Sequence, residues 1–165
     1  MVGVRAARPG EAAALTALCR RSKAHWGYDV EFMRRAAPAL TVVPAMIETG
    51  QVLVAEGPLP NPPPHAGEGG VGLLGVVAVD ATPRENEFDL ALLFVEPSAI
   101  GSGVGRRLFE APAKLVEMRG GTSLSILADP FAEAFYEHLG AVRIGEAPSD
   151  AIPGRMLPLL QYEIC

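Results

Sequence analysis

A glycine-rich turn between an apolar run and a helical pattern constrains this chain more than any other feature. The apolar residues 90–95 stop before Pro97, and glycine then occupies every second position over 101–105, just before Arg106. This order predicts a strand, a tight loop and the N-terminus of a helix. The first N–H groups of a helix lack partners and its dipole favours negative charge, while glycine lets the main chain approach a ligand. The turn therefore predicts a site for an anion, above all a phosphate-bearing ligand.

Length and composition favour one folded, soluble domain. The chain has 165 residues, 49% of them hydrophobic, which suits a proper core and argues against disorder. No apolar run approaches bilayer length and the first residues lack a signal peptide's apolar core, so we expect a cytoplasmic protein with no membrane partner. The net charge of −5 argues against a general nucleic-acid binder. Cys19 and Cys165 are too few for a disulfide framework or a zinc site, and we expect no metal.

Hydrophobic periodicity predicts strands and helices in a mixed order. Strand patterns cover residues 2–6, 51–56, 71–80, 87–95, 122–128, 141–145 and 156–164. Helical patterns cover residues 9–22, 30–37, 103–119 and 129–139, with a further helical turn at 44–48. Hairpins come early and alternation later, so the fold class is α+β, or mixed α/β.

The helix at 129–139 has a clear start and stop. Asp129 is predicted to be its N-cap, with Pro130 at the first helical position, and Gly140 is predicted to end it. Its apolar face is predicted to carry Phe131, Ala134, Phe135, His138 and Leu139.

Residues 57–70 interrupt this pattern, because prolines and glycines dominate the segment. Such a composition forms neither a strand ladder nor a helix. We interpret the segment as a long mobile loop inserted between two hairpin strands, within a single domain of residues 1–165.

Two common phosphate-binding motifs do not fit the glycine turn. A P-loop requires lysine directly after its last glycine, and Arg106 follows Gly105 here. A dinucleotide fingerprint requires Gly-x-Gly-x-x-Gly after an early strand and an acidic ribose partner further on. The glycines here are spaced by two, they lie late in the chain, and no acidic residue stands at the expected distance.

A third class fits, since the chain resembles the GNAT superfamily of N-acetyltransferases, which bind acetyl-CoA. That family's loop pattern, Gln/Arg-x-x-Gly-x-Gly/Ala, maps onto residues 100–105: Gly103 and Gly105 match, and Ile100 departs from it. Residues 129–141 are similar to a second family motif, a helix that carries Phe-Tyr and closes on Leu-Gly. The resemblance covers nearly the whole chain except 57–70. It implies a central, mostly antiparallel twisted sheet of six to seven strands, flanked by about four helices.

The resemblance also implies where acetyl-CoA would bind. The pyrophosphate would lie on main-chain N–H groups from the glycine turn, namely those of Gly101, Ser102, Gly103, Val104, Gly105 and Arg106. The pantetheine arm would pair with the backbone of the preceding strand, at Leu93, Phe94 and Val95. Asp129 and Tyr136 complete the cofactor-binding set that the resemblance implies.

The expected reaction is direct attack of an amine on the thioester, which needs a base or an ordered water. Tyr136 matches the family's general acid, and a main-chain N–H near Val95 is the candidate oxyanion donor. Glu87 and Asp89 share one face of the strand beside the thioester and are the candidate bases, although a solvated strand face explains them equally well. His25 is a weaker alternative base, because a histidine beside a tryptophan is more often structural.

These residues predict an N-acetyltransferase that acts on a primary amine of a small molecule or a peptide. A non-catalytic acyl-CoA-binding module shares the glycine turn and is the main alternative; a nucleotide-binding protein is a third. The identity of the acceptor stays open, because acceptor pockets are built from loops that vary with the substrate. A homodimer is a family habit, and nothing in the chain chooses between it and a monomer.

Overall fold

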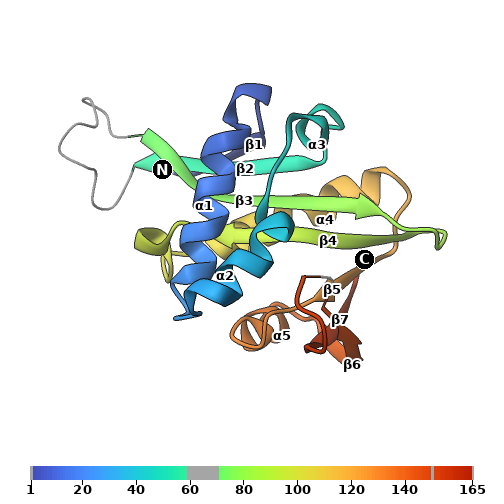
Figure 1. Ribbon diagram of the computed structural model, residues 1–165. Coiled ribbons are helices and arrows are strands. Elements are labelled where there is room, and N and C mark those ends of the chain that lie inside the picture. The colour runs from blue at the N-terminus through green and yellow to red at the C-terminus, as the bar shows by residue number, and fades with distance from the viewer. Residues whose placement is uncertain (1, 59–70, 150, 165) are drawn as a thin grey trace.

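Seven strands form one sheet in the computed structural model, which describes residues 2–58, 71–149 and 151–164 (Figure 1). The strands are β1 (Gly3–Ala6), β2 (Val52–Pro58), β3 (Val71–Ala81), β4 (Glu87–Val95), β5 (Ser123–Leu127), β6 (Val142–Pro148) and β7 (Met156–Glu163). Their order across the sheet is β1-β2-β3-β4-β5-β7-β6. Every neighbouring pair is antiparallel except β4 and β5, which are parallel. The predicted α+β class with a mostly antiparallel sheet is confirmed.

Five α-helices flank the sheet within the described residues. They are α1 (Ala12–Ala24), α2 (Val30–Ala36), α3 (Pro44–Glu48), α4 (Val104–Met118) and α5 (Glu133–His138). Figure 1 shows α1 and α2 on one face of β2–β4, and α4 on the opposite face. Both faces of the central strands are therefore covered, which explains why β3 is apolar along nearly its whole length.

The core of β3 alternates between these two layers. Val76 and Ala78 pack in the cluster that α1 and α2 cover. Val77 packs with the residues of α4 on the other face. Successive side chains of a strand point to opposite faces, so one buried strand contributes to both layers and holds α1 and α4 in fixed positions.

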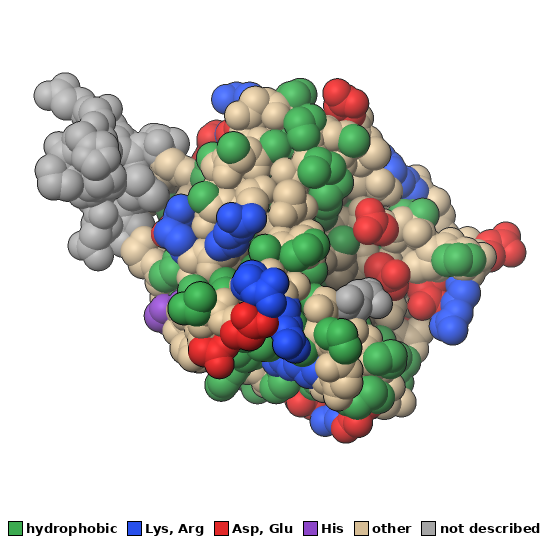
Figure 2. Space-filling model, in the orientation of Figure 1, with side chains coloured by type: hydrophobic (Ala, Val, Ile, Leu, Met, Phe, Trp, Pro, Cys, Tyr) green, Lys and Arg blue, Asp and Glu red, His purple; other side chains and the backbone are tan. Residues whose placement is uncertain are grey.

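Charged side chains of both signs lie over α1 and α2 on the face that Figure 2 shows. On α2, Glu31 forms ion pairs with Arg34 at 2.5 Å and with Arg35 at 3.1 Å. Pairs at spacings of three and four residues are neighbours on a helix surface. The two arginines of this helix therefore share one carboxylate.

The proline-rich segment differs from its prediction at its first two residues. Gly57 and Pro58 extend β2 and pair with Gly72 and Val71 of β3. Proline is tolerated there because β1 pairs only as far as Glu56, so β2 has a single neighbouring strand at Pro58. The antiparallel β2–β3 pair confirms the predicted hairpin, and the remainder of the segment, 59–70, lies outside the described residues.

The helix predicted to start at Asp129 starts later. A turn occupies the residues after Asp129, and α5 begins at Glu133 with Ala132 as its N-cap. The Asp129 carboxylate accepts a hydrogen bond from the Phe131 N–H at 2.9 Å, which closes the turn instead of capping the helix. The predicted apolar face is confirmed for Phe135 and Leu139, which pack against the core. It is wrong for Phe131, which is 55% exposed, and it omitted Tyr136, the buried residue of α5.

Candidate active site

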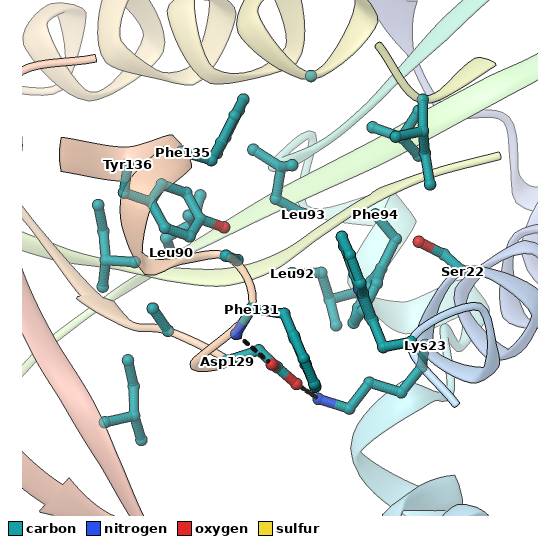
Figure 3. A pocket seen from close by; sticks show the side chains of 18 of the residues that line it. Ser22, Lys23, Leu90, Leu92, Leu93, Phe94, Asp129, Phe131, Phe135 and Tyr136 are labelled. Carbon is teal, nitrogen blue, oxygen red and sulfur yellow. Dashed lines mark hydrogen bonds and ion pairs between the residues drawn. The ribbon is translucent and has the colours of Figure 1, made fainter. Parts of the chain in front are cut away.

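A pocket of about 480 Å³ lies between the two parallel strands of the sheet (Figure 3). The pairing of β4 with β5 covers only Glu87–Asp89 and Ser123–Ser125. Beyond these residues the two strands separate, and residues 90–95 of β4 and 126–127 of β5 line the pocket. The register of β4 against β3 also shifts by one residue here, because Leu92 pairs with Ala78 while Leu90 pairs with Val79. The pocket is thus a gap that opens where β4 loses one of its two neighbours.

The open edge of β4 presents main-chain groups to this pocket. The N–H of Glu96 donates to the Leu74 carbonyl of β3 at 2.8 Å. Backbone groups alternate in direction along a strand, so those of Phe94 also turn toward β3, and those of Leu93 and Val95 turn toward the pocket. Leu93 and Val95 therefore offer an extended ligand a strand to pair with. Phe94, predicted to bind through its backbone, lines the pocket with its side chain instead (Figure 3).

The glycine turn closes one end of the pocket. Gly101 and Gly103 have positive φ values of 87° and 89°, a region that favours glycine. The Arg107 N–H donates to the Gly103 carbonyl, so the N–H groups of residues 103–106 precede the first helical hydrogen bond of α4. No side chain caps this helix end. The predicted order of strand, glycine turn and helix start is therefore present, with Gly101, Gly103, Gly105 and Arg106 among the lining residues.

The other residues of the turn have structural partners. Ser102 Oγ donates to the Ala99 carbonyl at 2.5 Å, and the Val104 side chain is buried in the core between β3 and α4. Arg106 forms an exposed ion pair with Glu110 on the next helical turn at 3.2 Å. Arg107 donates to the Val2 carbonyl, so its charge points away from the turn. Ser102 and Val104 can contribute their main chain only.

Gly105 sets the distance between α4 and α5. A Cβ atom built on Gly105 would lie 3.2 Å from the ring of Phe135, closer than nearly all real Cβ contacts. This close approach places Phe135 and Tyr136 beside the glycine turn. The two motifs therefore meet at Gly105, where a side chain would require the Phe135 ring to shift by a few tenths of an ångström.

Tyr136 lies at the inner wall of the pocket. Its ring packs against Phe109 and Phe135, with ring centroids 6.0 Å and 5.1 Å away. Figure 3 shows its hydroxyl oxygen pointing into the cavity, where it has no hydrogen-bond partner among the described residues. Burial, and to a smaller extent the negative charge of Asp129, raises the pKa of this phenol well above its ordinary value. Tyr136 is therefore a protonated, unpaired hydroxyl that faces the ligand space.

Asp129 also lines the pocket and is fully partnered. Its carboxylate accepts hydrogen bonds from Lys23 Nζ at 2.5 Å, from Tyr28 Oη at 2.7 Å and from the Phe131 N–H at 2.9 Å. Arg155 lies 3.8 Å away and donates to Tyr28 Oη at 2.8 Å. Burial opposes ionisation of this carboxyl, but its hydrogen bonds outweigh burial and lower the pKa of Asp129. Asp129 is thus ionised at neutral pH and holds its neighbours together.

Sequence reasoning missed the partners of Asp129. Lys23, Tyr28 and Arg155 are 106, 101 and 26 residues away from it in sequence, and no local pattern links these four side chains. Ser22 was missed as well: it is buried, it lines the pocket, and Figure 3 shows its hydroxyl among the lining side chains. A polar residue on the apolar stripe of α1 was the one signal that pointed to it.

The candidate bases lie away from the other candidates. Glu87 and Asp89 belong to the part of β4 that pairs with β5, and neither lines the pocket. Glu87 forms an ion pair with Arg84 at 3.4 Å. His25 is exposed, with its ring 5.5 Å from that of Trp26, and does not line the pocket either. Alternation along the strand predicted the shared face of Glu87 and Asp89 but not their distance from the gap.

Residues 2–58, 71–149 and 151–164 contain neither a cluster of metal-ligating side chains nor a membrane-spanning helix. Over that part of the chain, His, Cys, Asp and Glu side chains do not gather in groups of three or more that could hold a metal ion. Within the same residues, each helix is too short or too polar to cross a membrane.

These features define a class of site: a strand with an open edge and an uncapped helix start for an extended, phosphate-bearing ligand, with a buried phenol between them. Residues 70–151 match the sequence pattern of the acetyltransferase (GNAT) domain. No curated protein sequence matches the chain. The chain belongs to the GNAT superfamily and is an acyltransferase by class.

Solved structures share its fold. The N-acetyltransferase PaiA of Thermoplasma acidophilum, in complex with coenzyme A, superimposes with a TM-score of 0.74 at 13% identity over 99% of each chain. A GCN5-related N-acetyltransferase of Rhodopseudomonas palustris gives 0.70 at 22% identity, over 98% of this chain and 94% of that one. The yncA protein of Salmonella typhimurium, with its cofactor acetyl-CoA, gives 0.66 at 18% identity, over 100% of this chain and 95% of that one.

Proposed function

We propose that the protein transfers the acetyl group of acetyl-CoA to a primary amine of a small molecule or a peptide, by direct attack while both are bound. One observation supports this most: the uncapped start of α4, the open edge of β4 and the Tyr136 hydroxyl all border one pocket. A phosphate site, a pairing edge and a proton donor are the groups that a thioester of coenzyme A would need.

The glycine turn and β4 are the proposed cofactor-binding elements. The N–H groups of residues 103–106 would hold the pyrophosphate, because they point along the helix axis and lack acceptors. Arg106 lines the same end of the pocket and adds positive charge. The main chain of Leu93 and Val95 would pair with the amides of the pantetheine arm as a neighbouring strand would. Bound in this way, acetyl-CoA supplies an activated acetyl group.

Val95 and Tyr136 are the proposed catalytic groups. As the amine nitrogen attacks the carbonyl carbon, the Val95 N–H donates to the thioester oxygen, on which negative charge develops. A C–N bond forms and the C–S bond breaks. Tyr136 gives its proton to the departing sulfur and regains one from solvent. Its raised pKa keeps the hydroxyl protonated at neutral pH.

The proton of the amine leaves to water in this mechanism. Asp129 is the single carboxylate among the described residues that line the pocket. Because its hydrogen bonds hold it ionised and occupy both oxygens, it is a poor proton acceptor. The mechanism therefore uses no side-chain base, and the rate should rise with pH as the free-amine fraction of the acceptor rises.

Thermal unfolding and thiol release together test the proposal. Acetyl-CoA at about a hundred times its Kd should stabilise the protein by about 2.7 kcal/mol, while ATP and NAD should have no effect. An amine panel should then release free coenzyme A, measured as thiol. No shift with acetyl-CoA from a folded sample would overturn the proposal. Stabilisation by acetyl-CoA without turnover of any amine would favour an acyl-CoA-binding module. Stabilisation by ATP or NAD would favour a nucleotide-binding protein.

A further inference from the structure

Two aromatic rings from distant parts of the chain form an exposed stack on the pocket wall. Trp26 follows α1 and Phe131 lies in the turn before α5; their ring centroids are 5.3 Å apart and their planes differ by 3°. Both rings line the pocket, yet they are 39% and 55% exposed. Large aromatic rings gain free energy by burial, so an exposed pair at the wall of a pocket indicates a surface that a ligand covers.

A second pair of rings supports this stack from one side. Tyr28 meets Phe131 edge-on at 5.8 Å and stacks on Phe32 at 3.9 Å. Lys23 Nζ and the Arg155 guanidinium lie 5.1 Å and 5.2 Å from the Tyr28 ring centroid, which adds cation–π attraction. The hydrogen bond from the Phe131 N–H to Asp129 holds the backbone of the turn. The exposed rings are therefore held in place before any ligand binds, which lowers the entropy cost of binding.

The charges around the stack narrow the class of ligand. Lys23 and Arg155 are two cations that face the single carboxylate of Asp129. The side chains of Lys23 and Asp129 are only 13% and 12% exposed, so these charges are poorly screened by water. No carboxylate among the described pocket residues is left to hold a second ammonium group on the acceptor. The excess positive charge of the site would repel an acceptor with several amines. It would not repel a carboxylate on the acceptor.

We propose that the acceptor is an amine that carries an aromatic group, and that this group lies against the Trp26–Phe131 stack while the amine points toward Val95 and Tyr136. The inference rests on the proposed acetyl transfer and adds the substrate class. The shared chemistry is an aromatic ring beside a single amine. An arylalkylamine and an aromatic amino acid both have this chemistry. Only the amino acid also carries a carboxylate.

Four acceptors test the class. We expect 2-phenylethylamine and phenylalanine to show a kcat/KM about tenfold or more above that of butylamine, because a stacked ring adds apolar contact that a short alkyl chain lacks. Spermidine should show the lowest kcat/KM of the four acceptors, because it carries additional positive charges. A higher kcat/KM for phenylalanine than for 2-phenylethylamine would indicate that the acceptor carries a carboxylate. A higher kcat/KM for 2-phenylethylamine would indicate an arylalkylamine.

Variants of Trp26 and Phe131 test whether the aromatic ring of the acceptor lies against these two side chains. Trp26→Ala and Phe131→Ala should each raise KM for the better aromatic acceptor about tenfold, and each should raise the KM for butylamine by a smaller factor. Trp26→Phe keeps a ring and should recover most of the loss. Met118→Ala is the matched control, since Met118 is 84% exposed on α4 and lies outside the pocket. Trp26 is the single tryptophan of the chain, so its fluorescence should change as the aromatic acceptor binds.

The outcomes separate this inference from the proposed function. If the protein does not bind acetyl-CoA, the proposed function is wrong, and the proposed substrate class is wrong as well. With acetyl-CoA bound, equal kcat/KM for butylamine and 2-phenylethylamine, faster turnover of spermidine, or no turnover of either aromatic amine would overturn the substrate class alone. Wild-type KM values in both alanine variants would overturn the position of the ring on the stack.

Discussion

The Nζ atom of Lys23 lies 2.5 Å from the Oδ2 atom of Asp129, although 106 positions separate the two residues in the sequence. Lys23 is in the last turn of α1, and Asp129 follows β5. The ion pair therefore joins the helical layer to the far wall of the pocket (Figure 3). It holds the exposed aromatic stack and the turn before α5 in one arrangement.

Loss of this ion pair should destabilise the protein mainly above acidic pH. Lys23→Met leaves Asp129 with its other donors, so we expect the free energy of unfolding to fall by about 2 kcal/mol at pH 7, less than for a fully unpaired buried charge. Because Lys23 helps to lower the pKa of Asp129, this stability is present above the unfolded pKa of about 4 and is lost as pH falls below it. Denaturant unfolding at pH 7 and pH 3 measures both values.

A double-mutant cycle assigns this effect to the pair. Asp129→Asn and the double variant complete the cycle, and we expect a coupling energy of about 1–2 kcal/mol at pH 7. Strictly additive losses would mean that the two side chains do not stabilise each other.

Tyr136→Phe should lower kcat without loss of cofactor affinity. The substitution removes the hydroxyl that faces the cavity and keeps the ring that packs on Phe109. We expect a fall of about a hundredfold in kcat, the usual size of a lost general acid, with the KM for acetyl-CoA unchanged. Tyr162→Phe is the matched control, because Tyr162 also packs on Phe109 but does not line the pocket. Equal kcat values for the two variants would remove the acid role from Tyr136.

Gly103→Ala should weaken acetyl-CoA binding by more than its effect on folding. Alanine at a φ of 89° costs about 1–2 kcal/mol, and relief of that strain would move the first N–H groups of α4. We expect the Kd for acetyl-CoA to rise about tenfold or more, measured by titration calorimetry. Gly120→Ala places the same strain, at a φ of 81°, just beyond the other end of α4. If both variants bind acetyl-CoA as the wild type does, the glycine turn is not the phosphate site.

Glu11 should make the stability depend on pH in the acidic range. Arg5 holds this carboxylate with two hydrogen bonds, of 2.9 Å and 2.7 Å, and lowers its pKa to about 2 despite partial burial. A lowered folded-state pKa means that the stabilisation is complete above pH 4.5 and disappears as pH falls toward 2.

Glu11→Gln tests this pH dependence. It should lower the free energy of unfolding by about 1 kcal/mol at pH 7, after allowance for solvent screening, and match the wild type near pH 2. Glu110→Gln removes an exposed pair with Arg106 and should change stability little at either pH. A loss in Glu11→Gln that persists at pH 2 would point to packing rather than charge.

The domain should fold without the proline-rich segment. Pro58 and Val71 are paired neighbours at the ends of β2 and β3, so an Asn-Gly turn in place of residues 59–70 can join them directly. We expect the free energy of unfolding of the shortened chain to lie within about 1 kcal/mol of the wild-type value, since closure entropy changes only slowly with loop length. Its Kd for acetyl-CoA should be unchanged. Failure to fold would show that the segment is part of the domain rather than an insertion.

The glycine turn was predictable because its signals are local. A strand that ends near Pro97, glycines at 101, 103 and 105, and a following helical pattern lie within a few residues of one another. The buried stripe of α1 and the short helix α3 were equally readable, since helical spacing and a proline at the first position mark them. The start of α5 was misread because Asp129 and Pro130 are as suited to a turn as to a helix cap.

The sequence by itself determined the class of fold, the glycine turn before α4 and the phenol beside it, because periodicity, turn chemistry and motif spacing act over short distances. Only the tertiary structure decided where β4 and β5 separate, which main-chain groups turn toward the gap, and that Lys23, Tyr28 and Arg155 gather on Asp129. It also moved Glu87 and Asp89 away from the pocket, although their face was predicted correctly. These features depend on contacts between residues far apart in the chain, and no local pattern encodes the position at which two strands part.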